Sequence, residues 1–390
     1  MIGLCAFGRA MLEHFPLEPG AIYLNHGTVG VTPRRVLEAQ QAIRDQIERH
    51  PARYLLRELS GLTASSGLEQ PRLRAAAQQV AEFLGARAED LVFVANATTG
   101  VNAVLRSLSL EAGDEILIPN LAYGAVANAA AFVAREVRLE LPFPVSDPGV
   151  YVERVEQALT PRTKVAILDH LTSETALILP LAEMAERARA KGVLVLADGA
   201  HAPGQIPLDL PGLGVDWYVA NLHKWAFAPR GCGILWARPE RQPGLHPPVI
   251  SWGLDGGFTR EFDWVGTQDP SAYLAAPEGI RFMRDLGLEA LRQHNHALAW
   301  GAARMLMDRW NLRLETPQSM IGSMVTLPLP EGLGSSPAEA AGLKDALLFE
   351  ANIEVPIVAL GGRLWARISA QVYNDLSDIE RFAQALEERL

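Results

Sequence analysis

The chain has 390 residues, of which 49% are hydrophobic and 21% charged, an ordinary composition for a globular protein with room for two domains. A formal net charge of −10 without a run of basic residues argues against a nucleic-acid partner, and no apolar stretch reaches the roughly 18 residues that a membrane-spanning helix needs. The two cysteines are too few for a disulfide framework or a cysteine metal cluster, so we expect no metal site and a reducing, cytoplasmic location.

Short runs rich in Val, Ile and Leu lie in the middle of the chain, and amphipathic segments separate many of them. The runs predict strands over residues 91–95, 115–118, 137–141, 165–168, 193–197, 216–219 and 233–236. Apolar residues at three- and four-residue spacing predict helices over residues 100–110, 123–135, 150–159 and 181–191. This alternation predicts an α/β domain with a mainly parallel sheet that is covered on both faces.

A stretch rich in Pro and Gly, residues 238–257, ends this alternation. Beyond it the pattern predicts helices over residues 288–310, 339–351 and 377–390, and a strand over residues 364–369. We therefore predict a large α/β domain over residues 23–255 and a smaller α+β domain over residues 256–390. Residues 1–22 are expected to pack on the smaller domain or on a partner subunit.

The predicted strand at residues 193–197 leads directly into Asp198, within the sequence VLVLADGAHAPG. Ligands of open α/β sheets bind beyond the carboxyl ends of the strands, so a carboxylate at that point is placed to meet a ligand cation. The simpler interpretation is that Asp198 caps the turn or helix that follows.

Lys224 lies among Trp, Phe, Leu and Ala residues just after the predicted strand at residues 216–219. Apolar surroundings disfavour the charged ammonium, lower the pKa of the amine and make it nucleophilic, which suits Schiff-base chemistry. The alternative is a lysine at a helix end whose stem covers apolar surface while its amine reaches water.

The predicted strand at residues 91–95 runs into the sequence NATTG and then into a helix. Backbone N–H groups at a helix N-terminus bind phosphate, and the hydroxyls of Thr98 and Thr99 add donors. A threonine N-cap is the alternative interpretation. The stretch has neither the Gly-Lys-Ser/Thr of a P-loop nor the glycine spacing of a dinucleotide-binding turn.

A phosphate site, a carboxylate and an apolar lysine at the strand ends of one sheet are together the requirements of pyridoxal 5'-phosphate (PLP). The phosphate anchors the cofactor, the lysine joins its aldehyde, and the acid keeps the pyridine nitrogen protonated. Protonation lets the ring accept electrons from a carbanion at the α-carbon of a substrate. The cation of the ring in turn offsets the unfavourable burial of the acid.

Longer stretches, in order over nearly the whole chain, carry the pattern of a known family. They are YLNHGTVGVTPRRVLEAQ from Tyr23, NATTGVNAVLRSL from Asn96, HLTSETALILP from His170, LADGAHAPGQIPLDL from Leu196, NLHKWAFAPRGCGILW from Asn221, WVGTQDPSAYLA from Trp264 and RISAQVYN from Arg367. Together they resemble the class V aminotransferase family of fold type I PLP enzymes, above all its isopenicillin N epimerase-like branch. The resemblance implies a mainly parallel seven-stranded sheet in the large domain, a smaller α+β C-terminal domain, and a homodimer with shared active sites.

The resemblance also implies a role for each matching residue. Lys224 would hold PLP as a Schiff base and move protons, and Asp198 would support the pyridine nitrogen. Tyr123 would stack on the ring, and Ser173 and His201 would contact its hydroxyl. The phosphate would be held by Thr98, Thr99, Asn221, His223 and, from the neighbouring subunit, Thr267.

Substrate contacts follow from the same resemblance. Arg367 would bind the α-carboxylate of an amino acid as a bidentate fork, and Asn25 and His26 would contact the substrate from the entrance segment. Other interpretations stay open, because Ser173 suits a plain turn and His26 suits a hydrogen-bonded histidine without substrate contact. We expect packing or structural roles for the remaining residues of note, Cys232 and His170.

The expected reaction begins when Lys224 removes the α-proton of an amino acid. An epimerase or racemase returns that proton on the other face, an aminotransferase returns it to the cofactor, and a β-eliminating C–S lyase expels a leaving group. The epimerase-like branch favours the first outcome, with the other two as alternatives. Inversion needs a second acid opposite Lys224, for which Tyr123 and His26 are candidates.

The sequence argues against three other functions. A persulfide-forming cysteine desulfurase needs a thiolate shortly before the stretch RISAQVYN, and residues 352–365 contain no cysteine. A nicotinamide dehydrogenase would need a glycine-rich turn that the chain lacks. A non-catalytic PLP-binding protein would not need the complete set of Lys224, Asp198 and Arg367.

Overall fold

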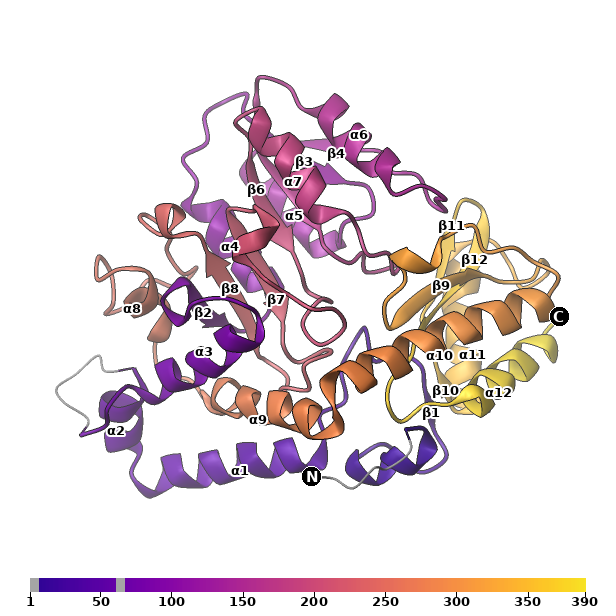
Figure 1. The fold of residues 1–390 in the computed structure, drawn as a ribbon, viewed down its shortest axis with the longest axis horizontal. Helices are drawn as coiled ribbons and strands as arrows, with labels where there is room; N and C mark the ends of the chain where they lie inside the picture. The colour runs from indigo at the N-terminus through magenta and orange to yellow at the C-terminus, as the bar shows by residue number, and fades with distance from the viewer. Residues whose placement is uncertain (1–6, 61–66) are drawn as a thin grey trace.

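A computed structural model of the chain describes residues 7–60 and 67–390, and Figure 1 shows its arrangement around one large sheet. The strands of that sheet are β2 (Leu91–Val94), β3 (Glu115–Pro119), β4 (Arg135–Leu139), β5 (Thr163–Asp169), β6 (Leu194–Asp198), β7 (Trp217–Asn221) and β8 (Gly233–Ala237). Their order across the sheet is β2-β8-β7-β6-β5-β3-β4, and only β8 runs against the others. The predicted mainly parallel, seven-stranded α/β fold is therefore confirmed.

Each predicted strand is present, with bounds that differ by one or two residues. The largest shift is at β4, predicted over residues 137–141 and found at Arg135–Leu139. This strand is the edge of the sheet, where charged side chains remain in water, so its start carries no apolar signal. The helix predicted from residue 100 begins at Ala97, because the Asn96 side chain accepts a hydrogen bond from the backbone N–H of Thr99.

Helices cover both faces of the large sheet, since alternate residues of its strands point to opposite sides. One face packs against α3 (Arg72–Phe83), α6 (Gly149–Ala158), α7 (Leu181–Ala190) and α9 (Ser271–Leu286). The other packs against α4 (Ala97–Ser107), α5 (Gly124–Val133) and α8 (Phe258–Asp263). Outside these layers, α1 (Arg34–Arg49) lies on α9, and α2 (Pro51–Arg53) leads into a π-helical turn at Tyr54–Leu59.

No helix among the described residues is long and apolar enough to cross a membrane. The cytoplasmic location expected from the cysteine content stays a prediction.

A second core lies to the right in Figure 1, around a small antiparallel sheet of order β11-β12-β9. Its strands are β9 (Met324–Pro328), β11 (Ile357–Leu360) and β12 (Arg363–Ser369), and a parallel pair joins β1 (Ile22–Tyr23) to β10 (Ile353–Glu354). The helices of this core are α10 (Leu288–Arg309), α11 (Pro337–Ala351) and α12 (Leu376–Glu387). Alternation along β12 sends Ala366 and Ile368 into this core and leaves Arg367 on the opposite face.

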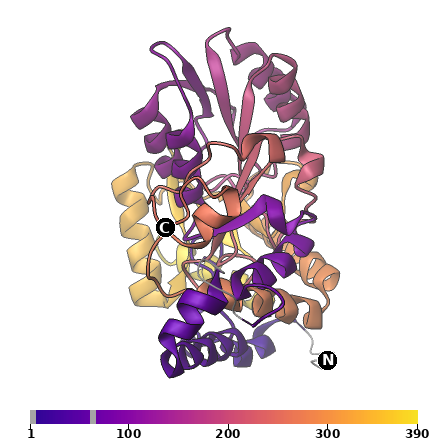
Figure 2. The ribbon, with the colours of Figure 1, turned by 90° about the vertical axis from the view of Figure 1, so that its left-hand side faces the viewer.

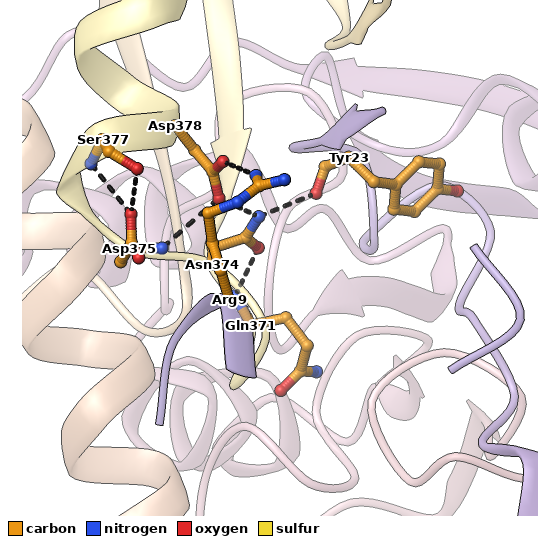
Figure 3. A network of polar contacts seen from close by, with 7 residues as sticks. All are labelled: Arg9, Tyr23, Gln371, Asn374, Asp375, Ser377 and Asp378. Carbon is orange, nitrogen blue, oxygen red and sulfur yellow. Dashed lines mark hydrogen bonds and ion pairs between the residues drawn. The ribbon is translucent and has the colours of Figure 1, made fainter. Parts of the chain in front are cut away.

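The N-terminal segment is tied to the C-terminal part of the chain, as Figure 3 shows. Arg9 pairs with the buried carboxylate of Asp378 at the start of α12, and the backbone N–H of Gly8 donates to Val372 at 2.7 Å. Asn374 donates both to Asp378 at 3.0 Å and to the carbonyl of Tyr23 at 3.3 Å. Residues 1–6 lie outside the described residues, so their predicted packing is not described.

Three elements depart from the predicted domain limits. β1 belongs to the second core, and α8 and α9, both in the part assigned to the smaller domain, pack against the large sheet. The division into residues 1–22, 23–255 and 256–390 stays a prediction.

Candidate active site

A cavity of about 260 Å³ lies where β5, β6 and β7 end and α4 begins, near the lower end of the size range of ligand pockets. It is lined by Thr28, Asn96, Ala97, Thr98, Tyr123, Asp169, Leu171, Ser173, Asp198, Ala200, His201, Asn221, His223 and Lys224. Most of the residues predicted for the site are therefore brought together. The predicted residues that do not line it are Thr99, Thr267, Arg367, Asn25 and His26.

Two carboxyl groups lie side by side on the floor of the cavity. Asp169 and Asp198 are the last residues of β5 and β6 and are register partners, and both are buried. Burial raises the pKa of Asp198, while the N–H of Ala200 at 2.9 Å and the charge of Lys224 act in the opposite direction. Burial and then the charge of Asp198 raise the pKa of Asp169 well above its usual range. The upward shift of the pKa is the larger at Asp169, so of the two carboxyl groups Asp169 is the one whose uncharged form is more favoured.

Lys224 follows β7, and its Nζ lies 3.0 Å from Nε2 of His201. Burial and, to a smaller extent, the charge of Arg367 lower the pKa of Lys224 to about 7, against the opposing effect of Asp198. Part of the side chain faces the open cavity, and the rest lies among protein atoms. A large fraction of this amine is uncharged at neutral pH and is available as a nucleophile or base.

His26 lies behind Lys224 and supports its backbone. Its Nε2 is 3.0 Å from the carbonyl oxygen of Lys224, which can only accept, so Nε2 carries the proton. Nδ1 then accepts from the hydroxyl of Tyr373 at 2.8 Å and from the N–H of Val31 at 3.4 Å. The ring is fully buried, and burial lowers the pKa of His26 to about 3.

Both ring nitrogens of His26 bond to protein groups, so this geometry does not support the predicted substrate contact, which stays a prediction. The alternative interpretation, a hydrogen-bonded histidine without substrate contact, agrees with the structure. The entrance segment approaches the lysine closely: a Cβ at Gly30 would lie 2.5 Å from the carbonyl oxygen of Lys224. Only glycine fits there.

The start of α4 forms a further part of the cavity lining. Thr98 lines the cavity, whereas the N–H and hydroxyl of Thr99 bond to the Asn96 side chain at 2.9 and 3.1 Å. The N-cap of α4 is therefore Asn96, and Thr99 donates to it; neither threonine is the N-cap that the alternative interpretation assumed. Asn221 accepts from the N–H of Ala97 at 2.8 Å and joins β7 to this helix. An N-terminus held this way favours an anion in the cavity.

His223 lines the cavity beside this helix. Its Nδ1 lies 2.9 Å from the carbonyl oxygen of Cys232, so Nδ1 carries the proton and the neutral ring keeps a lone pair on Nε2. Burial lowers the pKa of His223 to about 4.

Arg367 lies on β12 behind the cavity lining, bonds to two of the lining residues, Thr28 and Ser173, and is only 4% exposed. Its guanidinium donates to the carbonyl of Ser173 at 2.6 Å, to the side chain of Asn25 at 3.3 Å and to the hydroxyl of Thr28. Among the described residues no carboxylate lies within ion-pair distance, and Nε is buried without a partner. Burial lowers the pKa of Arg367 to about 10, so the group stays charged.

Asn25 does not line the cavity; it positions Arg367. Its side-chain oxygen accepts from Arg367, and its amide nitrogen donates to Glu354 at 3.0 Å. These two partners fix the orientation of the amide.

Tyr123 and Thr267 have the exposed positions among the predicted residues. Tyr123 precedes α5, lines the cavity and is 52% exposed, so its ring forms part of the cavity mouth. Thr267 is exposed and does not line the cavity of its own chain.

Sequence reasoning missed Asp169, Thr28 and the environment of His201. Asp169 ends a buried strand as Asp198 does, so the same signal was present in the sequence. Thr28 and Trp225 carry no local signal, because their partners, Arg367 and His201, are distant in the chain.

The donor set fits PLP and an amino acid. A helix N-terminus and Thr98 suit a phosphate, the carboxyl group of Asp198 suits a protonated pyridine nitrogen, and the partly uncharged amine of Lys224 suits an aldehyde. The buried, unpartnered Nε of Arg367 suits a carboxylate. Together with the fold, these groups define a PLP enzyme of fold type I.

Comparisons with known proteins agree. The chain belongs to the aminotransferase class-V family, whose model matches residues 22–382. It is 35% identical to an isopenicillin N epimerase of Streptomyces clavuligerus, with 95% of each chain covered. It is 32% identical to a putative L-cysteine desulfhydrase of Oryza sativa subsp. japonica, over 97% of this chain and 84% of that one. Among solved structures it resembles the cystine C–S lyase C-DES in complex with its reaction product cysteine persulfide, with a TM-score of 0.80, 22% identity and coverage of 95% and 98%.

Proposed function

We propose that the protein removes the α-proton of an amino acid whose carboxylate binds to Arg367. The observation that carries this proposal is the environment of Arg367, which is buried behind the cavity lining and donates hydrogen bonds only to neutral acceptors. Glu174 acts on its charge from beyond ion-pair distance. Such a cation is stabilised when a ligand supplies the missing carboxylate, ideally through two parallel hydrogen bonds. The base is the partly uncharged amine of Lys224, whose pKa the charge of Arg367 helps to lower.

The remaining residues are proposed to hold and orient the cofactor. Thr98, Asn221 and His223 would surround the phosphate at the start of α4, and Tyr123, Ser173 and His201 would contact the ring. All six residues line the cavity. When bound, PLP supplies an electron sink for the negative charge that forms at the α-carbon. Asp198 keeps the sink effective, because its ionised carboxylate holds a proton on the pyridine nitrogen.

Epimerisation is the proposed outcome. It needs a second acid on the side of the cavity away from Lys224, and the phenol of Tyr123 is the candidate among the lining residues. His26 is removed from consideration, since its ring is buried behind Lys224 with both nitrogens occupied. The similarity to isopenicillin N epimerases over nearly the full chain supports this choice.

A second candidate is β-elimination from cysteine, favoured by similarity to L-cysteine desulfhydrases at 30–32% identity. Elimination needs no thiol of the protein. A persulfide-forming desulfurase is not proposed, because Cys232 is fully buried and burial raises the pKa of its thiol, while Cys5 lies outside the described residues.

One experiment separates the outcomes. The purified enzyme is incubated in heavy water with a panel of L-amino acids, and chirality, deuterium at the α-carbon, keto acid, ammonia and sulfide are measured together. Deuterated D-isomer supports epimerisation, sulfide with ammonia supports elimination, and stoichiometric keto acid without D-isomer supports transamination. No α-deuterium with any amino acid contradicts the proposal.

Tyr123→Phe sharpens the result, because it keeps an aromatic ring and removes only the acid. If Tyr123 delivers the proton, the variant still exchanges the α-hydrogen of the L-isomer but forms no D-isomer. Unchanged racemisation would assign the second acid elsewhere.

We further propose a homodimer with active sites at its interface. The segment at residues 246–257 exposes four large apolar side chains, Val249, Ile250, Trp252 and Leu254, and Trp252 is 84% exposed. This segment and α8 lie on the side of the molecule that faces the viewer in Figure 2. Thr267 follows them and is exposed outside its own cavity, as a residue that serves a second subunit would be.

Sedimentation tests this proposal. Trp252→Lys is expected to shift the protein toward monomer and to lower activity, since a charge replaces an apolar contact. A fully active wild-type monomer would contradict it.

A further inference from the structure

His201 lies between the catalytic amine and a buried indole. Its Nε2 is 3.0 Å from Nζ of Lys224, and its Nδ1 is 3.4 Å from Nε1 of Trp225. The ring is buried, and Gln205 fixes its backbone by donating to the carbonyl of His201 at 2.9 Å. No contact in this row was expected from the sequence.

The donors in this row leave one arrangement of protons. An indole N–H can only donate, so Nδ1 of His201 must present its lone pair to Trp225. The neutral imidazole then carries its proton on Nε2, which faces Lys224. A proton on Nε2 needs an acceptor, and Nζ of Lys224 is an acceptor only as the uncharged amine.

A charged Lys224 would reverse the row. Its ammonium would donate to Nε2, the proton of the neutral imidazole would move to Nδ1, and that N–H would point at the N–H of Trp225. The bond from Trp225 and the charged form of Lys224 therefore exclude each other.

We propose that Trp225 is a positioning residue that fixes the Nε2–H tautomer of His201 and thereby favours the uncharged amine of Lys224. The inference rests on the proposed function in one respect, the assignment of Lys224 as the reacting amine. When PLP is bound, the same Nε2–H faces the cavity and is available to an acceptor on the cofactor ring.

The surroundings hold Trp225 in place. The indole is 2% exposed, packs with Ala176 and Met324, and lies 5.0 Å from the ring of His26. A Cβ at Gly27 would approach the indole to 3.4 Å, so the entrance segment closes over it. The indole N–H has no room to turn to another acceptor.

Other charged groups act on Lys224 as well. Arg367, from β12, disfavours its charged form, and Asp198, from β6, favours it. The pKa of Asp169 on β5 is raised well above its usual range, mainly by burial, which favours its uncharged form. His223 and His26 are neutral at physiological pH and add no charge. The charges of Arg367 and Asp198 act on Lys224 in opposite directions, and the hydrogen bond from Trp225 to His201 favours the uncharged amine in addition.

The test uses the full chain freed of cofactor and labelled with ¹⁵N-histidine. The ¹⁵N shifts of His201, assigned with His201→Gln, are expected to show a protonated Nε2 and an unprotonated Nδ1 in the wild type. A protonated Nδ1 in the wild type overturns the proposal whatever the variants do. This readout does not involve PLP, so it stays valid if the cofactor proves to attach elsewhere.

The second measurement is the pH dependence of carbamylation of Lys224 by cyanate, followed by mass spectrometry. In Trp225→Phe the tautomer is no longer fixed, a charged Lys224 can donate to His201, and the midpoint is expected to rise by roughly 0.5–1 pH unit. Trp236→Phe is the matched control, since Trp236 is equally buried and its indole N–H has no partner among the described residues. An equal shift in both variants, or none in Trp225→Phe, would reject the role of the indole N–H.

Discussion

Two arginines in this molecule, the half-buried Arg74 and the buried Arg367, have opposite surroundings. Arg74, on α3, donates to the carboxylate of Asp263 at 2.7 Å and to the carbonyls of Ala88 and Leu91. Arg367, on β12, donates only to neutral groups. The carboxylate of Asp263 compensates the charge of Arg74, whereas no carboxylate among the described residues pairs with Arg367 beside the cavity.

The buried aspartates repeat this difference. Asp263 has its arginine, whereas Asp198 has a backbone N–H and, among the described residues, no cation within ion-pair distance. An unpaired buried charge destabilises a fold unless a ligand completes it, so unpaired charges of both signs around one cavity mark a ligand that carries both. The same substitution made in each region should therefore lower the melting temperature in the Arg74–Asp263 pair, and lower turnover or substrate binding at Asp198 and Arg367.

The largest effect is expected from Lys224→Ala, which removes the amine between the two open charges. Covalent attachment of PLP should be lost, while melting temperature in the absence of cofactor stays the same or rises, because a lysine with a lowered pKa is removed from a buried place. Borohydride reduction and peptide mapping of the wild type should place the cofactor on Lys224. An adduct on Lys164, Lys191 or Lys344 would show that the wrong lysine was assigned.

Asp198→Asn is expected to lower turnover by roughly 10²–10³-fold, since a neutral amide cannot hold the protonated pyridine nitrogen. The matched control is Asp263→Asn, which should leave turnover nearly unchanged and lower thermal stability by unpairing Arg74. Measured kcat and melting temperature together decide the comparison. Near-normal turnover in Asp198→Asn would contradict the role of this residue.

Arg367→Leu is expected to weaken amino-acid binding by about 10–100-fold with little effect on cofactor binding. Because the cation has no carboxylate partner, its removal should not lower the melting temperature, whereas Arg74→Leu should lower it by leaving Asp263 unpaired. Substrate titrations and thermal melts of both variants provide the test. Equal stability losses in both would mean that Arg367 is a structural residue.

The same comparison explains how much the sequence could predict. The strands, and with them Lys224 and Asp198, follow from local runs of apolar residues that end in a polar one. The position of Arg367 came from family resemblance alone, since nothing local distinguishes it from Arg363 on the same strand. The support of Lys224 by His26 joins residues 198 positions apart, and such a contact appears only when the entrance segment is folded onto the sheet.

The smallest effect is expected at the second carboxyl group of the cavity floor. Burial and the charge of Asp198 raise the pKa of Asp169 well above its usual range, which favours its uncharged form. Asp169→Asn puts a neutral amide of nearly the same shape in its place, so turnover should change by less than about 10-fold, which corresponds to about 1.4 kcal/mol. Side-by-side kinetics of Asp169→Asn and Asp198→Asn check the assignment of charge within the pair. A loss at Asp169 equal to that at Asp198 would mean that Asp169 carries the charge, and that the residue at the end of β5 supports the cofactor nitrogen in place of the one at the end of β6.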